Sequence, residues 1–114
     1  MRIQILSDWT YIPKFAGNRD EPENEQMKVT FHPLSGKEEL EISSAGGFSF
    51  DQVILRAISK IENPPILVDQ NGKEKKATKD DIAQRSELKS LFYELVGEYS
   101  DVTKLGENEQ VNLK

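Results

Sequence analysis

His32 is the only histidine of the chain and the side chain best suited to general acid–base catalysis or to binding a metal ion. It ends a stretch of alternating polar and apolar residues and is followed by Pro33. No spacing in the sequence supplies it with a catalytic partner, so the simpler interpretation is a solvent-facing strand residue. We therefore expect no catalytic residue. A small enzyme that uses His32 stays open as an alternative, and an unchanged turnover rate in the His32→Ala variant would exclude it.

Paired carboxylates are a second arrangement that transfers protons. Glu38–Glu39 and Asp80–Asp81 are adjacent in the sequence, and adjacent side chains on a helix or strand point apart. The acidic residues between positions 20 and 25 offer hard oxygen ligands but lack the alternating ligands, Gly and terminal Glu of an EF-hand calcium loop. We expect a solvated acidic loop, with no metal site and no cofactor.

Other chemistries lack the residues that they require. The chain has no cysteine, which excludes a disulfide framework, thiolate catalysis and a cysteine-ligated zinc site. Gly46–Gly47 lacks the Lys-Ser/Thr pair of a phosphate-binding loop. The one basic cluster has no interleaved aromatic residues of the kind that bind single strands, which favours a solvated edge. It consists of Lys73, Lys75, Lys76, Lys79 and Arg85.

Charge and length narrow the class of partner. The chain has 114 residues, of which 15 are basic and 20 acidic, for a formal net charge of −5. Such a chain is repelled by phosphate groups, so we expect no nucleic-acid partner and no membrane partner. No apolar run approaches the roughly 20 residues of a membrane span, and residues 1–6 do not resemble a signal peptide. A cytoplasmic location is expected.

The hydrophobic pattern predicts an α+β fold, a small antiparallel sheet packed against two main helices. Alternation predicts strands at 2–6 and 27–32, and a further strand at 66–68 is followed by an Asn-Gly turn. Helical spacing predicts helices over 48–61 and 86–99. Residues 34–42 fit either a helix or a strand. Thr78 to Asp81 has the pattern of a helix-capping box with Asp in place of Glu.

These elements predict a single domain over residues 1–100. Its turn-forming, carboxylate-rich residues 17–26 are expected to form a flexible acidic loop, and the Ser/Ala/Gly residues 43–47 a flexible linker. The polar residues 101–114 are expected to form a mobile tail, because their apolar residues are too widely spaced for a core.

Large apolar side chains gather just before the acidic loop, at Trp9, Tyr11, Ile12 and Phe15. A small core could absorb all of them. Any that remain exposed would form the kind of patch that binds another protein. We take Trp9, Tyr11 and Phe15 as expected partner-binding residues.

The segment from Lys14 to Gln26, KFAGNRDEPENEQ, resembles a stretch found in small tail assembly proteins of long-tailed bacteriophages. In that family it is followed by a β-like run, here residues 27–31. Shorter similarities follow in the family's order at residues 58–63, 69–73, 78–82 and 88–98. The resemblance is thus spread over about residues 11–99.

The resemblance implies a non-enzymatic tail morphogenesis protein of a phage or prophage, active in the host bacterial cytoplasm. Its expected role is that of a tail assembly chaperone, which binds the long tape-measure protein until tail-tube subunits assemble around it. Phe15, Gly17, Asn18 and Arg19 match the motif and are the implied contact residues. The strands predicted here leave open a structural tail-tube or tail-completion subunit that assembles through edge strands, and a homo-oligomer.

Overall fold

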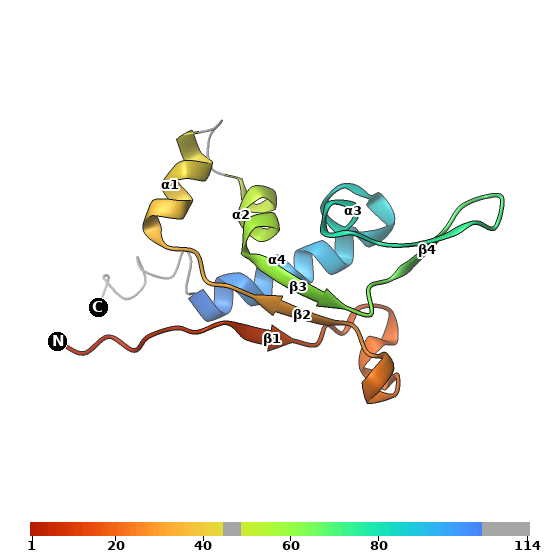
Figure 1. Ribbon diagram of the computed structural model, residues 1–114, viewed down its shortest axis with the longest axis horizontal. Coiled ribbons are helices and arrows are strands. Elements are labelled where there is room, and N and C mark those ends of the chain that lie inside the picture. The colour runs from red at the N-terminus through yellow and green to blue at the C-terminus, as the bar shows by residue number, and fades with distance from the viewer. Residues whose placement is uncertain (45–48, 104–114) are drawn as a thin grey trace.

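The fold is α+β, as predicted, and is described by a computed structural model for residues 1–44 and 49–103 (Figure 1). Residues 45–47 of the expected linker and 104–114 of the expected tail lie outside the described residues. In chain order the elements are β1 (Trp9–Tyr11), η1 (Phe15–Asp20), η2 (Glu23–Glu25), β2 (Lys28–Phe31), α1 (Gly36–Ser44), α2 (Phe50–Ala57), β3 (Ile58–Glu62), β4 (Ile66–Val68), β5 (Glu74–Lys76), α3 (Lys79–Gln84), η3 (Ser86–Leu88) and α4 (Lys89–Thr103).

β2 is the central strand of an antiparallel sheet in the order β1-β2-β3. Met27, Val29 and Phe31 are buried, whereas Lys28 and Thr30 between them are partly exposed. The predicted strand and its inward face are therefore confirmed. Because successive strand residues point to opposite faces, this alternation alone determines which face meets the core.

β3 corrects one prediction, because residues 58–61 belong to a strand and not to the end of the helix predicted over 48–61. Ile58 and Ile61 are three residues apart, as on one face of a helix. In the sheet, Ile61 lies opposite Val29 and Ile58 opposite Phe31, with the register shifting between these pairs. A β-bulge adds one residue to one strand, so both isoleucines reach the same face.

The helices pack on one face of this sheet, and α4 runs behind the strands in the view of Figure 1. Leu91, Leu95 and Tyr99 form its buried stripe, as the sequence periodicity predicts. α2 and α3 complete the layer through contacts with α4 and with each other. The buried apolar core consists of Met27, Val29, Phe31, Ile42, Val53, Ile54, Ala57, Ile58, Ala77, Ile82, Leu88, Leu91, Leu95 and Tyr99.

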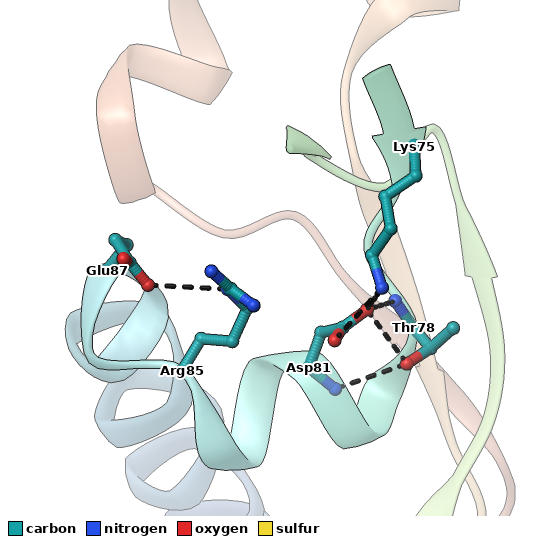
Figure 2. Close-up of polar contacts among 5 residues, drawn as sticks. All are labelled: Lys75, Thr78, Asp81, Arg85 and Glu87. Atoms are coloured by element: carbon teal, nitrogen blue, oxygen red, sulfur yellow. Dashed lines mark hydrogen bonds and ion pairs between the residues drawn. The ribbon is translucent and has the colours of Figure 1, made fainter. Parts of the chain in front are cut away.

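Two helices begin with reciprocal side-chain caps. At α3 the Thr78 hydroxyl accepts a hydrogen bond from the Asp81 amide (3.2 Å), and the Asp81 carboxylate accepts one from the Thr78 amide (2.9 Å) (Figure 2). This is the predicted capping box. Ser35 and Glu38 form the same arrangement at the start of α1. Of the two conformations that the sequence left open for residues 34–42, the helix is therefore the one that forms, over Gly36–Ser44. Each carboxylate accepts a hydrogen bond from a backbone N–H, and this bond is the main reason why the pKa values of Asp81 and Glu38 are lowered.

The strand predicted at 66–68 does not join the main sheet. As β4 it pairs only with β5, in a separate antiparallel hairpin that projects from the body (Figure 1). Leu67 packs against the core, whereas Ile66 and Val68 on the other face are exposed. The lysine-rich β5 is an edge of this hairpin, as predicted.

Both ends of the predicted domain also differ from expectation. Residues 2–6 form no strand, and Ile3 and Ile5 are exposed. At the other end α4 continues through Thr103, so residues 101–103 of the expected tail are helical. The expected acidic loop contains η1 and η2, whose 3₁₀ turns give it a defined backbone path.

Candidate functional site

The segment that carries the resemblance forms a compact loop, residues 13–27, beside the start of β2. Its path depends on two consecutive left-handed residues, Ala16 (φ 52°) and Gly17 (φ 73°). Glycine adopts this conformation without the steric cost of a side chain, which explains its place in the motif. Ala16 adopts it at a cost, so other contacts must hold the loop in place.

Asn18 provides most of these contacts. Its amide nitrogen donates to the carbonyl oxygens of Pro13 (2.8 Å) and Met27 (3.0 Å), and its amide oxygen accepts from the Met27 N–H (2.6 Å). One partly buried side chain therefore joins the two ends of the loop. A carboxylate could not donate these bonds, which is the physical reason for an asparagine at this position.

Arg19 and Gln26 tie the remaining backbone of the loop. The Arg19 Nε donates to the Ile12 carbonyl (2.8 Å), and its guanidinium lies 5.6 Å from the centre of the Tyr11 ring, a cation–π contact. The Gln26 amide donates to the carbonyls of Arg19 and Glu21. The motif side chains thus specify the shape of the loop.

Glu94 of α4 fastens the loop to the helical layer. Its carboxylate accepts hydrogen bonds from the Tyr11 hydroxyl (2.6 Å) and from the backbone N–H groups of Lys14 (2.6 Å) and Phe15 (3.2 Å). Burial is the first cause that raises the pKa of Tyr11 to about 12, and the hydrogen bond to Glu94 is the second. Both favour the neutral phenol.

The Tyr11 contact predicts a distinct alkaline titration. Since the folded-state pKa is raised, the stability that neutral Tyr11 contributes is fully present below pH 10 and is lost as the pH rises toward 12. In a spectrophotometric titration of tyrosinate, the difference between wild type and Tyr11→Phe should be a component centred near pH 12. A difference component near the ordinary value of about 10 would contradict the Glu94 contact.

Trp9 connects the edge strand to the core. Its ring stacks on Phe31 and Tyr99, with centroids 5.2 and 6.0 Å apart, and its indole N–H donates to the Glu98 carboxylate (3.0 Å). Trp9, Tyr11 and Phe15 are all partly buried and pack against the core. Each nevertheless keeps some exposed area. Their positions are therefore compatible with packing in the core and also with contact to a protein partner.

A shallow, mostly apolar groove of about 160 Å³ lies at the surface of the loop. Phe15 and Ala16 line the groove from the loop, and Pro65, which precedes β4, lines it from a distant part of the sequence. Glu21 is the one charged side chain among the described residues that line the groove. The lining residues are Pro13, Phe15, Ala16, Asn18, Glu21, Met27 and Pro65. Its volume suits one apolar side chain of a partner rather than a cofactor.

His32 lies outside this groove. Its Nδ1 is 2.8 Å from a carboxylate oxygen of Asp8, and both side chains are about half exposed, at 54%. Within residues 1–44 and 49–103, no three acidic or histidine side chains gather into a set that could hold a metal ion. That His32 takes no part in catalysis stays a prediction, and an enzyme that uses His32 stays the alternative.

The basic cluster lies around the β4–β5 hairpin, where a hollow of about 290 Å³ is lined in part by Lys73, Lys75 and Arg85. Figure 2 shows that Lys75 pairs with Asp81 and Arg85 with Glu87 (3.3 and 3.4 Å). Lys79 points elsewhere and donates to carbonyls at the end of α2. Neighbouring carboxylates therefore pair with two of the five basic residues of the cluster.

The structure thus places five of the six expected partner-binding residues at one loop and its anchor on α4, namely Tyr11, Phe15, Gly17, Asn18 and Arg19. Trp9 lies apart from the loop, on the core aromatic residues and Glu98. Sequence reasoning missed Glu94, Asn63 and Pro65. Asn63 donates to the carbonyls of Asn24 and Gln26 and so braces the loop from the end of β3. No local signal distinguishes Glu94 from the other carboxylates of α4, because its partners lie about 80 residues earlier in the chain.

Comparison of the chain with protein-family models, with curated proteins and with solved structures gave no match. Among the helices of the described residues, none has both the length and the apolar character that crossing a membrane requires.

Proposed function

We propose that this protein is a non-enzymatic tail morphogenesis protein of a phage or prophage, a tail assembly chaperone that binds the tape-measure protein in the host cytoplasm. The observation that carries the proposal is the groove of the motif loop. Of the residues that resemble the phage family, Phe15 and Asn18 line this open, mostly apolar surface, and Gly17 and Arg19 shape the loop that carries it.

The shape and charge of this surface fit a helical protein partner. The groove accepts one apolar side chain, and the loop around it exposes Asp20, Glu21, Glu23 and Glu25. An apolar side chain flanked by lysine or arginine would bury its apolar part and pair its charges with this rim. Shallow burial with a polar rim gives a reversible contact, which a chaperone needs if the tail tube is to replace it.

Co-expression with the tape-measure protein of the same phage tests the proposal. We expect the tape-measure protein to shift to the soluble fraction and to elute with the chaperone. Ala16→Gln, which fills the groove without changing the charge, should abolish this effect. The matched control is Gly97→Gln, because Gly97 is exposed on α4 and a Cβ atom added there points into open space.

Unchanged solubility of the tape-measure protein and no complex would contradict the chaperone proposal. The second candidate function is a structural tail subunit, which the exposed strands of the β4–β5 hairpin favour. A ring or tube former should grow continuously in size as its concentration rises, whereas a chaperone should stop at a small oligomer.

A further inference from the structure

The N-terminal arm, residues 1–7, carries exposed apolar side chains and joins no strand of the described sheets. It leaves β1 as an extended strand-like segment and runs away from the body (Figure 1). The exposed fractions of Ile3 and Ile5 are 77% and 88%, and that of Leu6 is 44%. Its pattern of alternating polar and apolar residues is that of a half-buried strand.

The chain itself leaves the arm unpaired. In the β1–β2 ladder Trp9 lies opposite Phe31, and one step further Asp8 meets His32 through a 2.8 Å contact. The next residue, Ser7, would lie opposite Pro33, which has no N–H to donate. The ladder therefore ends there, and β1 is an edge strand whose outer side pairs with no other strand of the described sheet.

We propose that the arm pairs in antiparallel fashion with the same arm of a second copy, which gives a two-fold symmetric dimer. With the two-fold axis at Ile5, that residue lies opposite its own copy. Arg2 then lies opposite Asp8, twice by symmetry. In this register the arm is complementary to itself in charge at both ends, and its central Ile5 meets the Ile5 of the other copy.

This register also assigns the two faces of the paired arms. Opposite residues share a face, so Ile3 and Ile5 of both copies form one apolar cluster, on the face that continues from Trp9. A register centred on Gln4 would oppose Arg2 to Leu6 and lose both ion pairs. A shift of one strand by one residue would place the isoleucines on opposite faces.

The expected association is closed and concentration-dependent. Two short strands bury less than the roughly 1,200–2,000 Å² of a standard stable interface. Because the same surface is used on both copies, the contact stops at two molecules and does not propagate. The inference stands independently of the tape-measure proposal, since its readout is the mass of the purified protein alone.

Analytical ultracentrifugation of the full chain tests the inference. Wild type should shift from the monomer of 13.0 kDa to twice that mass as its concentration rises. Ile5→Lys places two like charges directly opposite each other and should raise the dissociation constant about tenfold or more. Val68→Lys changes an exposed apolar residue of the β4–β5 hairpin and should dimerise like wild type.

A charge exchange tests the register. Arg2→Glu and Asp8→Arg should each weaken self-association, because each sets like charges opposite one another. An equimolar mixture of these two variants should form heterodimers, since every opposed pair is then of opposite charge. A wild type that stays monomeric up to about 1 mM would overturn the proposal, as would dimerisation of Ile5→Lys at the wild-type level. The proposal would also be overturned if the mixture of Arg2→Glu and Asp8→Arg associated no better than either variant alone, or if Val68→Lys lost dimerisation.

Discussion

Replacing Tyr99 with Ala is expected to lower the free energy of unfolding by about 3–5 kcal/mol, the cost typical of removing a large buried aromatic side chain. Tyr99 belongs to α4 and is 1% exposed, and its ring contacts Trp9 and Phe31 of the sheet. Its loss leaves a cavity and separates the edge strand from the helix. Since a domain of this size is stable by only about 5–15 kcal/mol, a large fraction of the variant should be unfolded in moderate denaturant.

Urea unfolding followed by Trp9 fluorescence measures this effect. Tyr99→Phe is the matched variant, because it keeps the ring and removes only the hydroxyl that accepts the Leu34 N–H (2.9 Å). We expect a loss of about 1–3 kcal/mol for Tyr99→Phe, the cost of a partly buried N–H without a partner. Equal stabilities of Tyr99→Ala and Tyr99→Phe would show that the ring does not connect the two layers.

Replacing Asn18 with Asp is expected to lower the free energy of unfolding at pH 7 by about 2–4 kcal/mol, although the two side chains have nearly the same shape. One carboxylate oxygen can still accept the Met27 N–H. The other faces the carbonyl oxygens of Pro13 and Met27, at 2.8 and 3.0 Å in the native contacts, and repels both. The loop should open, and the partner binding that we propose for its groove should be lost with it.

Acid distinguishes this repulsion from a simple loss of contacts. The repelled carboxylate should have a raised pKa in the folded state, so its protonation at lower pH relieves the destabilisation. Relative to wild type, the stability deficit of Asn18→Asp should shrink as the pH falls from 7 to 4, toward the ordinary Asp pKa of about 3.9 that applies in the unfolded state. The deficit of Asn18→Ala should stay constant over the same range. Parallel deficits for the two variants would contradict the donor role of the Asn18 amide.

The sequence predicted those elements whose burial repeats with a regular period. Residues 27–31 alternate strictly, and Leu91, Leu95 and Tyr99 follow the helical repeat, so their inward faces could be predicted without knowing their neighbours. The capping box of Thr78 and Asp81 was equally accessible, because all its atoms lie within one turn. Local patterns of this kind depend on backbone geometry alone.

Residues 58–62 show where this reasoning fails. The spacing of Ile58 and Ile61 favours a helix, and only the pairing with β2, with its register shift, places both in the core as a strand. Residues 2–6 fail in the opposite way. Their alternating pattern predicts a strand, but the ladder stops opposite Pro33 and no strand of the described sheet pairs with them. Periodicity indicates which residues are buried together, whereas the segment that they pack against decides whether they form a strand or a helix.

By itself, the sequence determined the α+β class, the central strand and its buried face, the last helix and the cap of α3, because each depends on contacts between residues a few positions apart. Its turn-forming and acidic residues also indicated a loop at residues 17–26. Only the tertiary structure decided that Glu94, Asn63 and Pro65 complete that loop and that the hairpin stands apart from the sheet. The physical reason is that such contacts join segments from about 40 to 80 residues apart, and the close packing that selects them leaves no trace in any local pattern.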